Sequence, residues 1–400
     1  MVHVPTDSHP LARLLRAQQE AEPDALAETL TAAVAAIGGH DVVVYLIDYE
    51  HTTLVPHPDV LPHGQRPEVA SVEGTMAGRA FTSAACQAAQ REDGWHVWIP
   101  IRERANYLGV VAITLPEWDE EREQFCLDLG LAAANLIRAS AHYTDLPHVL
   151  RRRKRMDLAA EMQWSLLPPL SYEINATALA GLVEPAYEVG GDAFDYAYNH
   201  GVLDLALFDT IGHGVASATL AALTVGAYRQ SRRRGKDLPD IAHDIDRALR
   251  AYSTKHPFAT ALLARLDTHS GSLDWITCGH PQPLVTRDGT CLPDNPDLLP
   301  GVPAGLGDLG ELIGSHNQTA LQPGDGVLFY SDGVVEARNA QGETFGDERL
   351  RDLLAREHRA NLPPPETVRR LVKASMEHAG QLHDDATMLY LRWSAPQQAG

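Results

Sequence analysis

The chain has 400 residues, of which 44% are hydrophobic and 22% are charged, a balance typical of a folded globular protein with two or three domains. Its formal net charge of −20 argues against binding to nucleic acid or to an anionic membrane surface. Two short basic runs, 151–155 and 232–234, depart from this charge and are typical of solvated helix faces.

The four cysteines do not form a C-x-x-C pair, so the sequence indicates neither a zinc site nor a disulfide framework. The N-terminal residues lack the apolar segment of a signal peptide, and no apolar run reaches the ~18 residues that cross a bilayer. We therefore expect a cytoplasmic protein that does not enter a membrane.

Residues 1–140 alternate helix and strand signals. Helical periodicity over 24–39 ends in Gly-Gly, and 41–48 is a β-branched run typical of a strand. Residues 94–116 predict a hairpin, and 119–140 predict a helix with acidic residues in its first turn. This order of elements indicates a small α/β sensor domain.

Residues 141–170 predict a helical linker. Pro147 interrupts it, apolar residues then recur near helical spacing over 156–166, and two prolines at 168–169 end the helix. An amphipathic helix between two domains packs on one of them or on a second copy of the chain. The linker could therefore form a homodimer or pack on one of the two domains.

Residues 171–395 alternate antiparallel hairpins with helices. Strand pairs flank turns at 199–201 and 268–272, and further buried strands are expected at 324–331 and 386–393. Helices are expected at 215–233, 238–252 and 363–379. The mixture predicts antiparallel sheets covered by helices.

Carboxylates recur where these strands meet turns, at Asp192, Asp209, Asp332, Asp384 and Asp385. A lone Asp beside Gly is more often a turn former than a ligand, so the recurrence, and no single position, indicates a site. Carboxylates that converge raise each other's pKa unless a cation balances them. Oxygen donors without cysteine favour Mg²⁺ or Mn²⁺, and two such ions about 4 Å apart can activate a water molecule and clamp a phosphate.

The second half resembles the PPM (PP2C-like) serine/threonine phosphatases, and most of all the bacterial branch that includes the stage II sporulation protein E and RsbU phosphatases. Matching stretches run in order through nearly all of residues 156–393. They include "YEVGGDAFDYA" (187–197), "LALFDTIGHGVASATLAAL" (205–223), "GDGVLFYSDGVVEARN" (324–339) and "HDDATMLYLR" (383–392). This resemblance implies an α/β/β/α sandwich of antiparallel sheets flanked by helices over residues 171–395.

The first half is similar to a GAF sensor domain through "VVVYLID" (42–48), "VEGTMAGRAF" (72–81) and "WIPIRERANYLGVVAIT" (98–114). A GAF domain followed by this phosphatase is a familiar bacterial order. The two resemblances together imply a two-domain α/β protein with the linker at 141–170. The GAF-like domain would bind an unknown small ligand or serve for dimerisation.

The resemblance to the phosphatases also implies a role for each site residue. Asp209 would bridge two ions, Thr210 would offer one of them its backbone carbonyl, and Asp209 and Asp332 would be the catalytic pair. A metal-bound water would attack, so no covalent intermediate on the protein is implied. The implied metal ligands are Asp192, Asp209, Thr210, Asp332 and Asp384.

Further residues are expected around these ligands. Asp195 and Asp385 would lie just outside the metal ligands. His213 would contact a metal-bound water, act as a general acid, or make a structural hydrogen bond in its turn. His280 is expected to hold a turn between strands.

We therefore expect a Mn²⁺- or Mg²⁺-dependent protein serine/threonine phosphatase under the control of the sensor domain. The resemblance implies a phosphorylated regulatory protein of the anti-anti-sigma (STAS) type as substrate. A hydrolase of small phosphate esters is a second reading. A weak or inactive signalling scaffold is a third, because Thr210 stands where this branch usually has Gly or Val and no basic phosphate-binding residue is identifiable.

Overall fold

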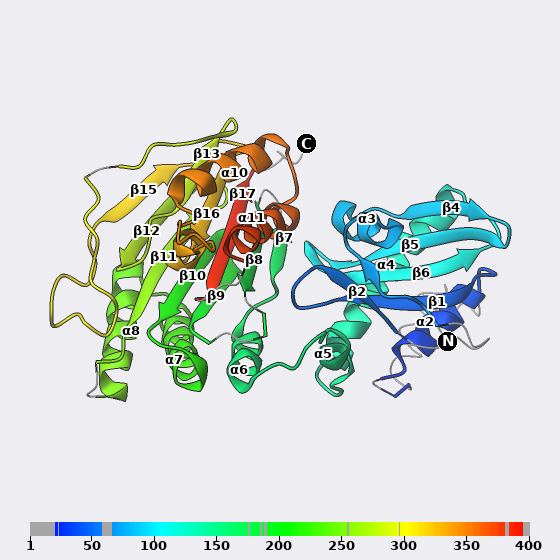
Figure 1. The fold of residues 1–400 in the computed structure, drawn as a ribbon, viewed down its shortest axis with the longest axis horizontal. Helices are drawn as coiled ribbons and strands as arrows, with labels where there is room; N and C mark the ends of the chain where they lie inside the picture. The colour runs from blue at the N-terminus through cyan, green and yellow to red at the C-terminus, as the bar shows by residue number, and fades with distance from the viewer. Residues whose placement is uncertain are drawn as a thin grey trace, which may run out of the picture. The chain divides into compact units, whose positions relative to one another are not determined.

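The computed structural model describes residues 21–22, 24–57, 66–174, 177–184, 186–187, 190–253, 256–295, 297–380 and 384–394. The chain divides into two compact units, Met1–Arg155 and Met156–Gly400, which are coloured blue to cyan and green to red in Figure 1. The division falls inside the predicted linker. Among the described residues, no helix combines the length and the apolar character that crossing a membrane requires.

The first unit is built on one antiparallel sheet with the strand order β3-β2-β1-β6-β5-β4. The strands are β1 (His40–Ile47), β2 (Thr53–His57), β3 (Ala70–Ser71), β4 (Gln87–Arg91), β5 (Gly94–Glu103) and β6 (Asn106–Leu115). The predicted hairpin at 94–116 is thus confirmed as β5 and β6.

Helices pack on both faces of this sheet. The helices are α2 (Leu26–Ala35), α3 (Met76–Ser83) and α4 (Glu120–Ser140). The alternation of β1 places Val44 and Leu46 in one apolar core with α2 and α4, and Ile47 in a second core with α3. Both faces of β1 are therefore buried.

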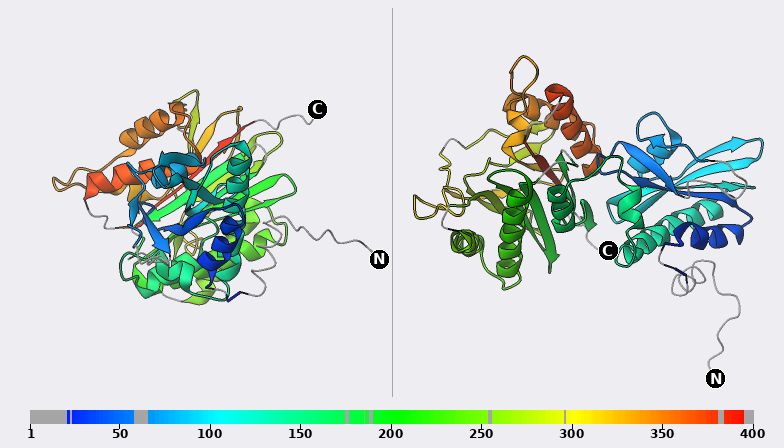
Figure 2. Two further views of the ribbon diagram at one scale, coloured as in Figure 1. Left: turned by 90° about the vertical axis from the view of Figure 1, so that its right-hand side faces the viewer. Right: turned by 60° about the horizontal axis from the view of Figure 1, so that its bottom comes forward.

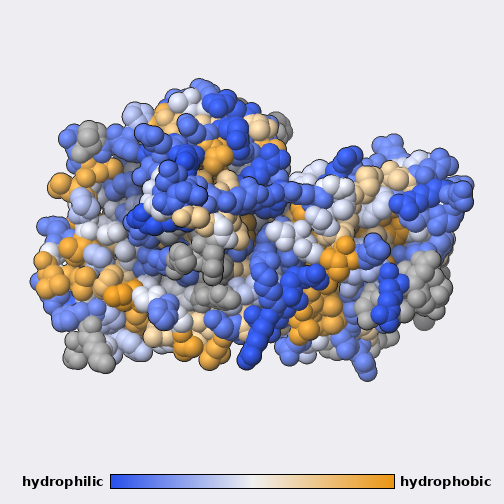
Figure 3. Space-filling model, in the orientation of Figure 1, coloured by the Kyte–Doolittle hydropathy of each residue, from blue (hydrophilic) through white to orange (hydrophobic). Residues whose placement is uncertain are grey.

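The linker contains two short helices, α5 (Leu146–Leu150) and α6 (Leu158–Leu166). The interruption predicted for this segment lies at residues 151–157, between the two helices, and not at Pro147. Pro147 does not break a helix but lies in the first turn of α5, where a missing N–H has no cost. Tyr143, Val149 and Leu158 are exposed, so the question of a homodimer stays open. On the face drawn in Figure 3, hydrophilic residues predominate and apolar residues form small groups.

The second unit contains two antiparallel sheets. The first has the order β15-β12-β11-β10-β9 and consists of β9 (Asp192–Asn199), β10 (Val202–Thr210), β11 (Ala259–Asp267), β12 (Ser272–Cys278) and β15 (His316–Ala320). The second has the order β14-β13-β16-β17-β8-β7 and consists of β7 (Ser171–Ile174), β8 (Thr177–Glu184), β13 (Leu284–Arg287), β14 (Thr290–Cys291), β16 (Gly326–Tyr330) and β17 (Ala386–Trp393).

Helices cover the outer faces of the two sheets (Figures 1 and 2). The helices are α7 (Gly214–Arg232) and α8 (Leu238–Tyr252) on the first sheet, and α9 (Asp332–Glu336), α10 (Asp347–Arg359) and α11 (Pro364–Ala379) on the second. This arrangement confirms the predicted α/β/β/α sandwich of antiparallel sheets flanked by helices.

The core between the two sheets follows from the alternation of their strands. In β10, Leu203, Leu205 and Leu207 pack between the sheets, whereas Ala206 and Phe208 pack under α7 and α8. Asp209 has the same parity as the three leucines. The strand therefore directs its carboxylate to the space between the sheets, at the end of their shared core.

Candidate metal centre

Asp192 and Asp209 lie directly opposite each other on β9 and β10. A two-residue turn sets this register, because His200 and Gly201 both have positive φ angles, 50° and 88°, as a type I′ hairpin turn requires. The turn pairs 199 with 202, and counting back along both strands pairs 192 with 209. The sequence thus determines this carboxylate pair.

The second sheet delivers the other acidic residues. Asp332 is the first residue of α9 and follows β16 after one residue, while Asp384 and Asp385 directly precede β17. These two strands are antiparallel neighbours, so the end of β16 meets the start of β17. Asp332 was expected at a strand end and instead opens a short helix.

These carboxylates act on one another electrostatically. Burial first, and then the charges of Asp332, Asp384 and Asp385, raise the pKa of Asp209 to about 7, against the opposing effect of a hydrogen bond with Asp192. The pKa of Asp192 lies well above its ordinary value because the side chain is buried and because Asp209 and Asp385 are close. Burial also raises the pKa of Asp332, with Glu336 and Asp384 adding to the effect. The structure therefore brings five predicted carboxylates to one place.

Asp385 holds the turn that precedes β9. Its Oδ2 accepts hydrogen bonds from the backbone N–H groups of Gly190 (3.3 Å), Gly191 (2.7 Å) and Asp192 (3.0 Å). Burial raises its pKa, and these three hydrogen bonds lower it. Its carboxylate is thus occupied with orienting the segment that carries Asp192.

Close backbone approach explains why glycine follows Asp332. A β-carbon on Gly333 would overlap the backbone carbonyl oxygen of Asp385, so only glycine lets α9 pack against the start of β17. The Ser-Asp-Gly pattern is therefore a packing requirement that also fixes the position of Asp332.

Two further predicted residues are Asp195, which faces away from the carboxylates, and His213, which lies in the turn after β10. Asp195 has the opposite strand parity from Asp192 and faces α7, where its oxygens accept from Arg229 (2.8 Å) and Arg232 (2.7 Å). His213 is exposed at the N-cap of α7, and its side chain makes no capping hydrogen bond. The alternation within "DAFD" was the sequence signal that separates Asp195 from Asp192.

Two buried polar residues lie behind the site: His280, which was expected to hold a turn between strands, and Gln163, which the sequence did not single out. His280 Nδ1 lies 2.7 Å from the hydroxyl of Thr260, the residue of β11 that pairs with Asp209. Burial lowers the pKa of His280 to about 3, so its ring is neutral. Gln163 of α6 donates its side-chain N–H to the backbone carbonyl of Asp192. The signal for Gln163 was its place among buried alanines, three and four residues after Ala160 and Ala159.

The chemistry of these residues fits a divalent cation. Their donors are carboxylate and carbonyl oxygens, which Mg²⁺ and Mn²⁺ prefer. Asp192 Oδ2 is buried and has no hydrogen-bond partner among the described residues. Within the same residues, no group of three His, Cys, Asp or Glu side chains is already arranged to hold an ion. The carboxylates therefore lie near one another, but a bound ion would have to bring them closer to coordinate it.

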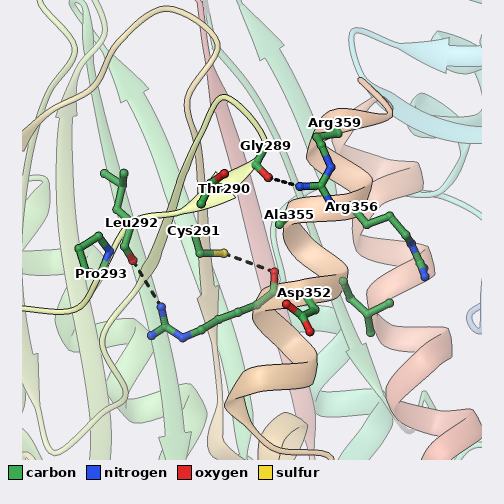
Figure 4. Close-up of a pocket in the computed structure, with 11 residues that line it drawn as sticks. Gly289, Thr290, Cys291, Leu292, Pro293, Asp352, Ala355, Arg356 and Arg359 are labelled. Carbon is green, nitrogen blue, oxygen red and sulfur yellow. Dashed lines mark hydrogen bonds between the residues drawn. The ribbon is translucent and has the colours of Figure 1, made fainter.

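A separate cavity of about 610 Å³ lies between residues 289–293 and α10 (Figure 4). It lies at the far end of β16 from Asp332, because β13 and β14 adjoin the first residues of that strand. Its arginines already have partners: Arg351 forms a two-pronged contact with Asp294, and Arg359 donates to a backbone carbonyl. These arginines do not supply the phosphate-binding residue missing from the sequence.

The second unit matches a known protein family. Residues 199–394 match the family described as stage II sporulation protein E (SpoIIE). The phosphoserine phosphatase RsbU of Bacillus subtilis is 22% identical over 244 residues, which cover 60% of this chain and 70% of that protein. The phosphoserine phosphatase RsbP of the same organism is 21% identical over 197 residues, 47% of this chain and 46% of RsbP. The chain thus spans less than half of RsbP.

A solved structure shares the fold. The RsbU and RsbW domains of Rv1364c from Mycobacterium tuberculosis align with a TM-score of 0.50 and 26% identity, over 57% of this chain and 63% of that one. The similarity shows a shared fold over more than half of this chain.

Proposed function

We propose that this chain, whose second unit contains a SpoIIE-type domain of the PP2C class, is a metal-dependent protein serine/threonine phosphatase. The observation that carries the proposal is the opposed pair Asp192–Asp209, with Asp332 and Asp384 acting on it from the other sheet. Four acids without a balancing cation would destabilise the fold, and a binding function is the simplest physical reason to keep them together.

The residues of the site would divide the work as follows. Asp192, Asp209, Asp332 and Asp384, with the carbonyl of Thr210, would hold two Mn²⁺ or Mg²⁺ ions. These ions would supply a water molecule of lowered pKa and positive charge for the phosphoryl oxygens. Asp209 would help to hold the ions with a carboxylate that β10 fixes in place.

His213 would contribute at the solvent side. It stands between Gly212 and Gly214 and is exposed next to the end of β10. From there it could donate a proton to the departing serine or threonine oxygen. The alternative is a purely structural role for this histidine in the turn before α7.

A phosphorylated protein is the substrate that fits this site best. The lip beside Asp209 is open: Ile211 and Val215 are 47% and 46% exposed, and Asp384 is exposed as well. An open site suits a phosphoserine or phosphothreonine on a protein surface, whereas a small ester would need an enclosing pocket. Because relatives are named phosphoserine phosphatases of the RsbU type, we propose an anti-anti-sigma (STAS) phosphoprotein as the substrate.

The test is phosphate release from a phosphorylated STAS-type protein with Mn²⁺. We expect release by the native chain and a loss of at least about 100-fold in Asp209→Ala and Asp332→Ala, because each change removes a charge from the ion site. Asp195→Asn serves as the matched control, since that carboxylate faces the helices. Equal rates in the native chain and both alanine variants would rule out the proposed chemistry.

A signalling scaffold is the second candidate. It is favoured by the absence, among the described residues, of three acidic or His/Cys side chains already arranged around an ion. Calorimetric titration separates the two functions: binding of Mn²⁺ at micromolar to low millimolar concentration supports the enzyme, and no heat at millimolar Mn²⁺ supports the scaffold.

We propose that the first unit, predicted to be GAF-like, regulates the site through the linker. Two contacts of α6 support this route. Gln163 holds the backbone of Asp192, and the carbonyl of Leu166 accepts from Arg229 (2.7 Å), which also pairs with Asp195. A movement of α6 would therefore reach the first strand of the site directly.

A further inference from the structure

Thr210 is buried at the end of β10 and makes an unusual number of polar contacts. Its side chain is 2% exposed. Its hydroxyl lies 3.1 Å from the Gly191 carbonyl oxygen, 3.1 Å from the Ser217 carbonyl oxygen and 2.9 Å from the Ser217 hydroxyl. These contacts tie three chain segments together: the turn before β9, the end of β10 and the first turn of α7.

The turn before β9 is held from two sides. Asp385 accepts from its three N–H groups, as described above. The carbonyl of Gly191 accepts from the backbone N–H of Thr210 (3.3 Å) and lies within hydrogen-bond distance of the Thr210 hydroxyl. Asp385 therefore binds the N–H groups of this turn, and Thr210 binds the carbonyl oxygen of Gly191. Asp192 is the next residue along the chain.

Ser217 completes the arrangement. It is fully buried in the first turn of α7, and its hydroxyl also lies 3.4 Å from the Thr210 carbonyl oxygen, to which it donates. A β-carbon on Gly191 would lie 2.9 Å from the Ser217 hydroxyl, 3.0 Å from the Thr210 carbonyl oxygen and 3.5 Å from Asp385 Oδ2. Three oxygens therefore converge on Gly191, where a side chain would meet all of them.

We propose that Thr210 and Ser217 form a positioning pair that fixes the Gly190–Gly191 turn and thereby sets the affinity of the Asp192–Asp209 site for its divalent cation. The inference rests on the proposed function and deepens it. It reverses the expectation from the sequence, in which Thr210 was the residue that would weaken the site.

The two hydroxyl groups suit this role because their protons can be redistributed. The Ser217 hydroxyl can donate to the Thr210 carbonyl at 3.4 Å or to the Thr210 hydroxyl at 2.9 Å. In the second arrangement the Thr210 hydroxyl donates to Gly191, and the Thr210 carbonyl is free to accept another partner. The carbonyl can therefore be released without movement of any non-hydrogen atom.

The test is a calorimetric Mn²⁺ titration of the full chain. Thr210→Val removes the hydroxyl and keeps the branched shape, Ser217→Ala removes its partner, and Thr210→Ser keeps the hydroxyl without the branch. Thr224→Val is the matched control, because Thr224 is also buried in α7 but its hydroxyl donates to Leu220 within the helix.

We expect Thr210→Val and Ser217→Ala each to weaken Mn²⁺ binding about 3- to 10-fold, the size of effect that one buried hydrogen bond carries. Thr210→Ser should stay within about 2-fold of the native chain, and Thr224→Val should be unchanged. The double variant should lose less than the product of the single effects, because the pair acts as a unit. If Thr210→Val does not fold, as judged by circular dichroism, Ser217→Ala and Thr210→Ser carry the test.

The outcomes separate this inference from the proposed function. Native chain that binds no Mn²⁺ contradicts the proposed function itself. If the native chain binds Mn²⁺ and both Ser217→Ala and Thr210→Val bind it with the same affinity, only the proposal of a positioning pair is overturned. A loss in Thr224→Val as large as in Thr210→Val would also overturn it, because the effect would then be one of general stability.

Discussion

The carboxylates of Asp192 and Asp209 face each other across two strands that a short turn fixes in register. Neither strand can slide to separate them, because a shift of one residue would turn the inner leucines outward. The repulsion between these acids is therefore built into the fold. Its consequence should be measurable in the protein without metal.

Stability without metal should fall as the pH rises. The pKa of Asp209 is raised from 3.8 to about 7 in the folded chain, so its contribution is fully favourable below about pH 4 and is lost as the pH rises through about 7. Each pKa unit corresponds to about 1.4 kcal/mol, and we expect a decrease of a few kcal/mol in the free energy of unfolding of chelated protein. Urea unfolding with EDTA at about pH 5 and pH 8 measures it.

Asp209→Asn is the control for this prediction. It should be more stable than the native chain at about pH 8 without metal and should show a weaker dependence on pH, because one ionisation is removed. Added Mn²⁺ should stabilise the native chain at that pH. The same pH dependence in both proteins would contradict the assigned role of Asp209.

Gly191→Ala should damage the site more than its small size suggests. The new methyl group would lie 2.9 Å from the Ser217 hydroxyl and 3.0 Å from the Thr210 carbonyl oxygen, too close for either. We expect a loss of about 1–3 kcal/mol in the free energy of unfolding and weaker Mn²⁺ binding. Gly226→Ala is the control, since a β-carbon there would meet nothing within 4 Å. Equal stability of the two variants would be inconsistent with the structure.

At the scale of single residues, the sequence predicted which carboxylates gather at the site better than it predicted what each of them contacts. The pairing of Asp192 with Asp209 follows from the hairpin count, and the opposite orientation of Asp195 follows from the alternation of the same strand. The contacts of Thr210 with Ser217 cross the turn between β10 and α7, and its contact with Gly191 spans 19 residues, so neither strand nor helix periodicity indicates them.

At the scale of elements, α6 is the part of the linker that matters to the site. Gln163 is 1% exposed and reaches the backbone of Asp192 from a helix of only nine residues. Gln163→Leu should therefore weaken Mn²⁺ binding several-fold at nearly unchanged melting temperature, because it removes one contact to the site and keeps the apolar packing. Ser165→Ala, in the exposed part of the same helix, is the control.

Proline at Met162 gives a harsher version of the same test. It would break α6 one residue before Gln163 and should shift the Mn²⁺ dependence of the phosphatase more than the stability of the fold. A Mn²⁺ dependence identical to that of the native chain would refute control through α6.

The elements that the sequence predicted are those with strong local signals. The helices at 215–233, 238–252 and 363–379 appear as α7, α8 and α11 within one residue, and the final strand appears as β17. Strands such as β8 and β13 and the short helix α9 were not predicted, because their stability comes from neighbours distant in the chain. The break in the linker was predicted at Pro147 and lies instead at the seven residues between α5 and α6, which carry no glycine or proline to mark it.

At the scale of the whole molecule, the division into Met1–Arg155 and Met156–Gly400 predicts separable folding. Each unit has its own apolar cores, so residues 156–400 expressed alone should unfold cooperatively and keep the Mn²⁺ affinity of the full chain within about 3-fold when the first unit carries no ligand. Calorimetric melting and Mn²⁺ titration of the fragment measure both. A fragment that is unfolded would show that the first unit is part of the fold and not only a regulator.

A crystal structure of the protein grown with Mn²⁺ tests the central claim most directly. Anomalous scattering at the manganese edge should reveal ions contacted by Asp192, Asp209, Asp332 and Asp384 at the oxygen distances of about 2.0–2.3 Å that such ions adopt. Asp195 should keep its arginine partners and lie away from them. Manganese bound only elsewhere, or absent from these four carboxylates at millimolar concentration, would contradict the proposal that this fold carries a metal-dependent phosphatase.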